Sequence, residues 1–399
     1  MPGRSASRLP LRGRLVRILA SGVAPAVATV GALLAGAVML RALGANPLSA
    51  YRAMLIGAFG SPSALSATAL KAVPLVLVGV GICIAFRANV INIGGEGQMV
   101  LGALVATMAA LAAPGLPPVL LLPLVLAAGL VGGALWGAIP GALKAYLGVN
   151  EILSTIMLNI IAVQVMNYLL RGPLIDPDQV SGTSQIPQTV RLPENADLPV
   201  LINSTRLHAG VIVAVLAAVV VYVLLWRTSQ GFRLRAVGLN PDAARYAGIP
   251  VQRSVTLALA LSGAFAGLAG AVEVFGSVSH RMVTDGSTTG FTGGAGFNGI
   301  VTALFGSLHP LWTLLSSFIF GGLLVGANVL QRALQIPAAL IIALNGLIVV
   351  FVVSSDRLRR RLRLRAERSE QVAEERAAGA KPPESEPSPV FTPSKGDGK

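Results

Sequence analysis

The chain has 399 residues, of which 54% are hydrophobic and 12% are charged, and its mean hydropathy is +0.72. Soluble domains carry about 25% charged residues, so this composition excludes an ordinary water-soluble fold and favours a protein embedded in lipid. The formal net charge of +14 does not indicate nucleic-acid binding, because the basic residues gather beside apolar stretches rather than among stacking aromatics. The single cysteine, Cys83, excludes an intrachain disulfide, and no Cys/His spacing predicts a metal site.

Apolar segments of nearly the length that a bilayer requires, about 20 residues, predict an all-α integral membrane protein with about ten transmembrane helices. In chain order these segments are Ile18–Leu40, Ala67–Phe86, Gly97–Ala113, Val119–Ile139, Glu151–Leu170, His208–Trp226, Ser254–Gly276, Gly296–Leu308, Leu311–Leu330 and Ile336–Ser354. The third and eighth are short and rich in glycine, which is typical of broken or re-entrant helices. The first is longer than the apolar core of a signal peptide, so we expect it to remain as a span.

The distribution of arginine predicts the orientation in the membrane. The basic segment Met1–Arg17, the connection Pro140–Asn150 and the loop Arg227–Arg253 are expected in the cytoplasm. The long loop Arg171–Leu207 has acids that balance its arginines and is expected outside. With ten spans, both termini are then cytoplasmic.

The chain therefore divides into a basic cytoplasmic N-terminus (residues 1–17), a transmembrane domain (18–354) and a cytoplasmic tail (355–399). The tail is basic and then rich in charge, proline and serine, a composition that predicts disorder. Within the transmembrane domain, Gly94–Ala103 faintly resembles Gly294–Gly306, and the two segments are expected to run in opposite directions. This similarity indicates a weak inverted repeat.

The cytoplasmic loop 227–253 contains a strong signal for a short helix. Asn240 is suited to the N-cap, Pro241 to the first helical position, and Asp242 to the positive end of the helix dipole. Gly248 can adopt the left-handed conformation that ends a helix. We expect a helix over about Pro241–Ala247, held by packing because isolated short helices are marginal.

Asp242, Ala243 and Ala244, followed by Gly248, resemble the EAA-x-x-x-G coupling motif of ABC importer permeases, with aspartate in place of glutamate. The flanking sequence is similar to the version found in permeases of branched-chain amino acid, simple-sugar and nucleoside importers. Three further stretches resemble the nucleoside and simple-sugar branch: Ala85–Ala103, Trp136–Asn159 and Gly296–Trp312. The resemblance covers about Asn46–Val353.

This resemblance implies a permease subunit of an ATP-driven importer in the bacterial plasma (inner) membrane. It implies a second permease, identical or paralogous, cytoplasmic ATP-binding subunits, and an extracytoplasmic binding protein that delivers a nucleoside or a simple sugar. The chain has no GxxxxGK[ST] motif, so we expect ATP hydrolysis on a partner and no enzymatic activity or bound cofactor here. The residues that the motif assigns to ATPase coupling are Asn240, Pro241, Asp242, Ala243, Ala244, Arg245 and Gly248.

Polar residues inside apolar segments are candidates for the substrate pathway, since charge in a bilayer is costly. Asn92, Glu96 and Gln98 lie among glycines at an expected helix break, and Asn159 lies on a polar stripe of the fifth span. These side chains either bind the substrate or cap and brace the break, and the sequence leaves both interpretations open. Glu273, near the outer end of its span, suits a gate or a structural pair.

Two other classes of protein are alternatives to an ABC permease. An ion-coupled secondary transporter of a small polar solute would use acids such as Glu96 and Glu273, but it leaves the capped cytoplasmic helix unexplained. A membrane-embedded enzyme would require paired carboxylates or HExxH, and the sequence shows neither. For the substrate, a purine nucleoside ranks before a simple sugar and a branched-chain amino acid.

Overall fold

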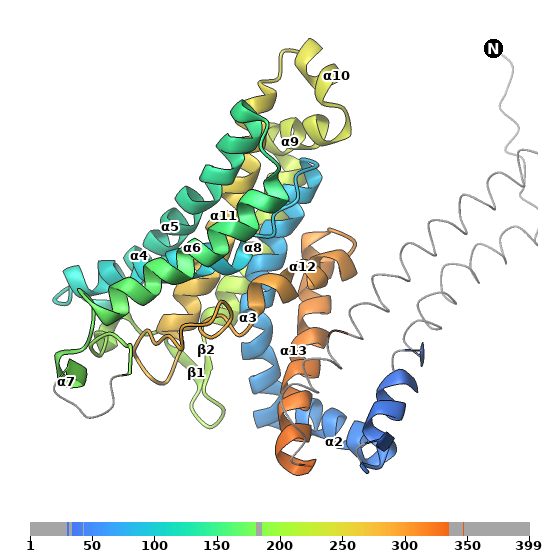
Figure 1. The fold of residues 1–399 in the computed structure, drawn as a ribbon, viewed down its shortest axis with the longest axis vertical. Coiled ribbons are helices and arrows are strands. Elements are labelled where there is room, and N and C mark those ends of the chain that lie inside the picture. Colours follow the sequence, from blue (N-terminus) through green and yellow to red (C-terminus); the bar gives the residue numbers. More distant parts are fainter. Residues whose placement is uncertain (1–29, 32–33, 43, 181–185, 335–345, 347–399) are drawn as a thin grey trace, which may run out of the picture. The chain divides into compact units, whose positions relative to one another are not determined.

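The computed structural model describes residues 30–31, 34–42, 44–180, 186–334 and 346. The described residues of the compact unit Ala32–Val353 are mostly helical (Figure 1). The longer helices are α2 (Pro47–Phe59), α3 (Pro62–Arg87), α4 (Gly95–Ala112), α5 (Pro118–Leu147), α6 (Glu151–Arg171), α8 (Gly210–Arg227), α9 (Ser229–Leu239), α11 (Val251–Phe275), α12 (Ala295–Phe305) and α13 (Pro310–Leu334). In this part of the chain, 7 helices are long and apolar enough to cross a membrane: α3, α4, α5, α6, α8, α11 and α13.

The second to ninth predicted spans coincide with these 7 helices and with the shorter α12, so the all-α membrane fold is confirmed. Helix α12 has 11 residues, too few for a hydrocarbon core of about 30 Å, which agrees with a broken segment. The first predicted span is described only from Val30 onwards, and Ile336–Ser354 lies outside the described residues apart from Gly346. The count of ten therefore stays a prediction.

Two helices and one helix end differ from those expected from the sequence. Helix α2 was not predicted, and the loop 227–253 contains α9 in addition to the expected short helix. The predicted connection Pro140–Asn150 is wrong, since α5 continues to Leu147. Pro140 is accommodated inside α5, and the helix ends only where Gly148 takes a φ of 68° and its N–H bonds to Lys144 and Leu143 carbonyls.

Helices α5 and α11 cross in backbone contact. A Cβ built on Gly133 would lie 2.1 Å from the carbonyl oxygen of Gly263, and one on Gly267 would lie 2.2 Å from that of Gly129. Only glycine permits such an approach, as expected for a small-xxx-small face in a membrane. This crossing fixes the position of α11, which contributes to both polar regions described below.

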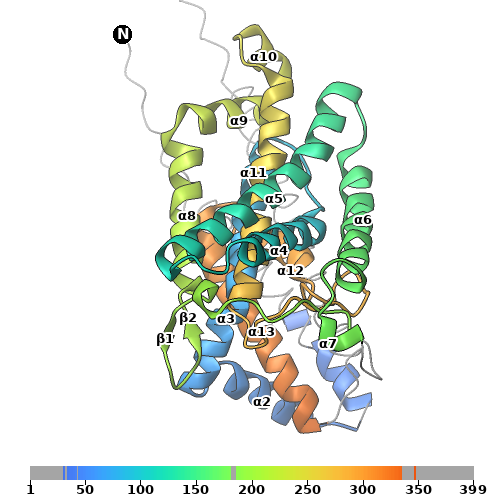
Figure 2. The same ribbon diagram turned by 90° about the vertical axis from the view of Figure 1, so that its left-hand side faces the viewer.

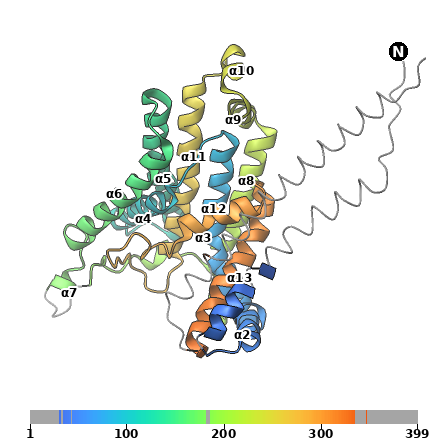
Figure 3. The same cartoon turned by 45° about the vertical axis from the view of Figure 1, so that its right-hand side comes forward.

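Helix α3 is a central element of the unit, and α11, α12 and α13 all pack on it (Figure 3). Helix α13 also packs on α2, where a Cβ on Gly322 would meet the Phe59 ring at 2.4 Å. Helices α9 and α10 (Pro241–Tyr246) lie at one end of the bundle, called here the α10 end (Figure 2). Strands β1 (Val200–Ile202) and β2 (Leu207–His208) form a small antiparallel hairpin at the opposite end, called the hairpin end.

At the hairpin end, the loop after α6 is fastened to the loop after α11. The first loop also contains α7 (Pro177–Val180) and a short 3-10 helix (Glu194–Ala196). Asp176 pairs with Arg281, and His280 lies 2.7 Å from Asp197. The hydrogen bond from Arg281 holds the pKa of the Asp176 carboxyl below its usual range. The described residues of the long loop are thus tied to the rest of the hairpin end.

Candidate functional site

The short helix α10 is built by the caps that the sequence predicts. The Asn240 side chain accepts hydrogen bonds at 3.0 Å from the backbone N–H groups of Asp242 and Ala243. At the other end Gly248 has a φ of 78° and donates to the Arg245 carbonyl. The next N–H, of residue 249, donates to the carbonyl of residue 244, which completes a Schellman motif. The local structure predicted for this helix is therefore confirmed, with its end at Tyr246.

Helix α10 projects from the bundle, and α9 and α10 each expose a large apolar side chain. The Leu239 and Tyr246 side chains are 88% and 94% exposed, whereas Ala244 faces inwards and is 4% exposed. Asp242 and Arg245 form a surface pair at 3.6 Å, which contributes little to stability. The last residue of α9 and the last residue of α10 are thus available for contact with another protein.

Helix α9, which the sequence analysis missed, connects α10 to the membrane helices. Its N-cap Thr228 accepts from a backbone N–H, a signal that would have marked its start. A Cβ on Gly238 would lie 2.1 Å from the Arg87 carbonyl oxygen, so α9 rests directly on the end of α3. The guanidinium groups of Arg87 and Arg235 lie 5.3 Å and 6.0 Å from the Trp226 ring of α8. Helix α10 is thereby linked through α9 to α3 and α8.

The four polar residues predicted for the substrate pathway lie close together around the start of α4. We call Asn92, Glu96, Gln98 and Asn159 the polar junction. Their exposed fractions are 0%, 0%, 1% and 4%. The sequence brings them together because the chain turns back after α3, and glycines allow α4 to begin beside α6 and α12.

Asn92 is the centre of the polar junction. Its Nδ2 donates to Gln98 Oε1 at 2.9 Å and to Ser262 Oγ on α11 at 2.8 Å. Its Oδ1 accepts from the Gly94 backbone N–H at 2.8 Å and from Gln98 Nε2 at 3.2 Å. The amide therefore uses its hydrogen-bonding capacity within the protein.

Asn159 fastens α6 to the same turn. Its Oδ1 accepts from the Gly97 backbone N–H at 2.8 Å, and its Nδ2 donates to the Ile93 carbonyl at 2.9 Å. On the same polar stripe, the Thr155 hydroxyl donates at 2.6 Å to the carbonyl of Glu151 in its own helix. The stripe thus makes structural contacts at this level of α6.

Glu96 joins the first turns of α4 and α12. Its Oε1 accepts from the Phe297 backbone N–H at 3.0 Å, where the positive end of the α12 dipole favours a carboxylate. The two backbones touch, because a Cβ on Gly296 would lie 2.4 Å from the Glu96 nitrogen. The structure thus brings the two segments of the weak repeat into contact. Together these bonds favour the interpretation in which the junction braces a helix break.

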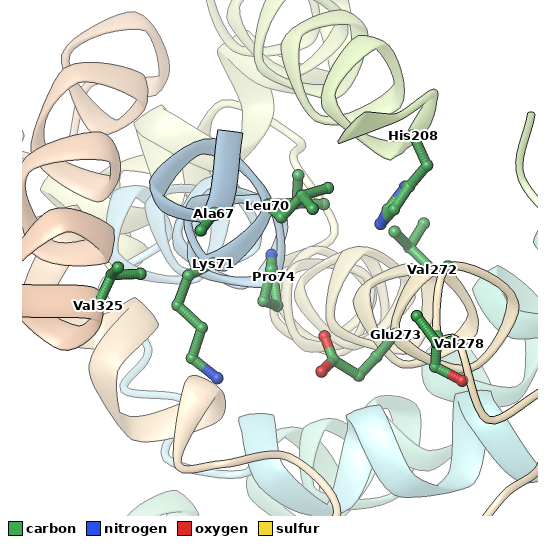
Figure 4. A pocket seen from close by; sticks show the side chains of 12 residues that line it. Ala67, Leu70, Lys71, Pro74, His208, Val272, Glu273, Val278 and Val325 are labelled. Atoms are coloured by element: carbon green, nitrogen blue, oxygen red, sulfur yellow. The ribbon is translucent and has the colours of Figure 1, made fainter. Parts of the chain in front are cut away.

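A second polar region surrounds a cavity of ≈ 340 Å³ between α3, α11, α13 and β2, called here the hairpin-end cavity. Lys71 and Glu273 extend into the space between these helices, and His208 approaches from β2 (Figure 4). Sequence reasoning considered Glu273 but missed Lys71 and His208. Lys71 is a lone charged residue within the apolar segment Ala67–Phe86, and this is the sequence signal that would have identified it.

A family model described as the branched-chain amino acid transport system / permease component matches residues 64–353. The chain belongs to this permease family. It is 35% identical to the guanosine ABC transporter permease protein NupP of Bacillus subtilis, over 86% of this chain and 97% of the relative.

Two further relatives cover nearly as much of the chain. The glucose ABC transporter permease protein TsgB13 of Haloferax volcanii is 35% identical over 84% of this chain and 88% of its own length. The nucleoside ABC transporter permease protein NupB of Lactococcus lactis is 32% identical over 82% and 89%. No solved structure is a significant match. The chain is therefore an ABC transporter permease, which replaces the alternative of an ion-coupled secondary transporter.

Proposed function

We propose that the chain is the membrane permease of an ATP-driven importer for a nucleoside or a simple sugar. Family membership combined with the projecting helix α10 is the observation that carries the proposal. Relatives named for guanosine and for glucose are each 35% identical to the chain. Both solutes carry several hydroxyl groups on a ring, and this shared chemistry defines the proposed substrate class.

The α10 end is proposed to face the cytoplasm, with both termini on that side. The basic residues of α9 and its flanks support this orientation, since arginine is enriched in cytoplasmic loops. The hairpin end then faces an extracytoplasmic binding protein that delivers the solute. A second permease, identical or paralogous, completes the pair in the bacterial plasma membrane.

Helix α10 is proposed to insert into a groove on a cytoplasmic ATP-binding subunit. The exposed Leu239 and Tyr246 side chains supply apolar contact area, and the two caps keep the helix rigid. Motion driven by ATP hydrolysis on the partner then passes through α9 to α3 and α8. The residues assigned to this contact are Asn240, Pro241, Asp242, Ala243, Ala244, Arg245 and Gly248.

The polar junction is proposed to act on the pathway indirectly. Asn92, Glu96, Gln98 and Asn159 hold the break between α3 and α4 in one geometry. The two asparagines make their hydrogen bonds within the chain, and Glu96 accepts through one carboxylate oxygen from the Phe297 N–H. A rigid break positions α4 and α12 along the pathway. The four side chains themselves do not contact the solute.

Reconstitution of the complete transporter tests this function. The permease, its partner permease, the ATP-binding subunit and the binding protein are assembled in proteoliposomes, and uptake of tritiated guanosine or glucose is measured. We expect uptake that requires both ATP hydrolysis and the binding protein, with a non-hydrolysable ATP analogue as the control. Uptake driven by an ion gradient without ATP would contradict the proposal.

A further inference from the structure

The hairpin-end cavity combines opposite charges with apolar walls. Lys71 comes from α3 and Glu273 from α11, and both point into the space that the cavity occupies (Figure 4). Within the described part of the chain, neither side chain forms a hydrogen bond or comes within 4.0 Å of an opposite charge. The Lys71 charge attracts that of Glu273 across this space. Two ionisable groups without contact partners in an apolar setting indicate a ligand site.

His208 supplies a third polar group with a defined tautomer. Its Nδ1 accepts from the Gly210 backbone N–H at 3.1 Å, so the proton of the neutral ring lies on Nε2, which can donate. Burial lowers the pKa of His208, which keeps the ring neutral near pH 7. The ring is held in place, because a Cβ on Gly276 would lie 2.5 Å from Nε2.

Helix α3 adds a backbone acceptor at the same place. Pro74 lies inside α3 and has no N–H, so it cannot bond to the carbonyl of Leu70 one turn earlier. Leu70 and Pro74 both line the cavity. The interruption of the helical ladder therefore falls at the cavity wall, where a ligand hydroxyl is a suitable donor.

We infer that the hairpin-end cavity binds the hydroxyl-bearing ring of a neutral solute, a sugar or the ribose of a nucleoside. The Glu273 carboxylate accepts hydrogen bonds from ring hydroxyls, and the Lys71 ammonium and His208 Nε2–H donate to ring or hydroxyl oxygens. Val272 and Val325 line the cavity and cover the C–H faces of the ring. This inference rests on the proposed function and gives it a site.

Charge and size both fit a small neutral solute. The charges of Lys71 and Glu273 cancel, so the cavity offers no net attraction to an anion or a cation. A volume of ≈ 340 Å³ falls within the range of about 300–1,000 Å³ that small-molecule sites occupy. The cavity lies beside the hairpin, on the side where the proposed orientation places delivery of the solute.

Uptake kinetics of the reconstituted transporter test the site. In Glu273→Gln and Lys71→Met, we expect the KM for tritiated guanosine to rise about ten-fold or more, because a hydrogen bond to a charged group is lost. Assembly with the ATP-binding subunit and basal ATP hydrolysis should not change. Glu194→Gln is the matched control, since this acid is exposed at the hairpin end outside the cavity and should leave KM unchanged.

The double variant separates ligand binding from a purely structural ion pair. If Lys71 and Glu273 bind solute, Lys71→Met with Glu273→Gln should transport less than either single variant. Recovery of the wild-type KM in the double variant would overturn the inference and identify a structural pair. Competition of guanosine uptake by L-valine, with none by glucose, would overturn it in favour of a zwitterion site.

A cavity-filling variant avoids dependence on the charged residues. Val325→Phe adds bulk from α13 and should raise the KM for guanosine without loss of the assembled complex. An unchanged KM in this variant and in both single charge variants overturns the site while the proposed function stands. No ATP-dependent uptake of guanosine or glucose by the wild type would instead contradict the proposed function itself.

Discussion

The polar junction and the hairpin-end cavity both place carboxylates and nitrogen donors among membrane helices, but they use them differently. In the junction, Asn92 and Asn159 use their donors and acceptors in hydrogen bonds within the chain, and their side chains are almost fully buried. In the cavity, Lys71 and Glu273 form no hydrogen bond and no ion pair among the described residues. A polar residue inside a membrane protein is therefore not in itself a ligand site. What separates Asn92 and Asn159 from Lys71 and Glu273 is whether their hydrogen bonds are already made.

The largest effect is expected where both regions share a support. Helix α11 contributes Ser262 to the junction and Glu273 to the cavity, and its crossing with α5 relies on backbone contact at Gly133. Gly133→Ala should cost more than about 2 kcal/mol, because its Cβ would overlap a carbonyl oxygen and force the helices apart. Thermal unfolding in detergent measures this loss. Gly115→Ala, at a position with no atom within 4 Å of the added Cβ, is the control and should unfold like the wild type.

Asn92→Ala should damage the junction alone. It removes four hydrogen bonds and leaves the Gln98 amide buried without them, which should cost about 2–3 kcal/mol. The protein that remains folded should keep a normal KM for guanosine. Asn203→Ala, at an exposed position, is the matched control. A raised KM at normal stability would move Asn92 into the solute site.

Glu96→Gln in the junction makes the same chemical change as Glu273→Gln in the cavity, so the two variants allow a direct comparison of the two regions. Glu96 interacts with the Phe297 N–H at the start of α12, so loss of its charge should lower stability by about 1–2 kcal/mol. Its KM should stay normal, whereas that of Glu273→Gln should rise. The comparison between the two regions fails if the two variants exchange these phenotypes.

The smallest effect is expected for Ser262→Ala. Its hydroxyl accepts one hydrogen bond from Asn92 in the connection between α3 and α4, and a side-chain hydrogen bond between membrane segments contributes about 0.6 kcal/mol on average. Asn92 retains its bond to Gln98, so uptake and assembly should match the wild type. A loss of stability as large as that of Asn92→Ala would show that the hydrogen bond from Asn92 to α11 stabilises the junction more than the bonds within the turn do.

Local signals in the sequence were sufficient for α10, because Asn240 and Gly248 act on backbone groups a few residues away. The membrane helices followed equally well from apolar length. The ends of α5 and the existence of α9 did not, since Gly148 and Thr228 were not recognised as cap signals. The two polar regions required tertiary structure. Glu96 accepts from the Phe297 N–H across 201 residues, and Lys71 and Glu273 line one cavity only when α3 packs on α11.

Substitutions at Gly248 test most directly whether α10 couples an ATP-binding subunit to this permease. Gly248 has a φ of 78° with no atom within 4 Å of an added Cβ, so a substitution there changes backbone strain and meets no neighbour. Valine at this φ is strained by about 1–3 kcal/mol, whereas asparagine tolerates it.

Co-purification of the ATP-binding subunit and guanosine-stimulated ATP hydrolysis are therefore measured in Gly248→Val and Gly248→Asn. We expect Gly248→Val to insert normally but to lose the subunit or the stimulation, and Gly248→Asn to keep both. Normal co-purification and normal stimulation in a well-expressed Gly248→Val protein would contradict this expectation and would make α10 a simple connector.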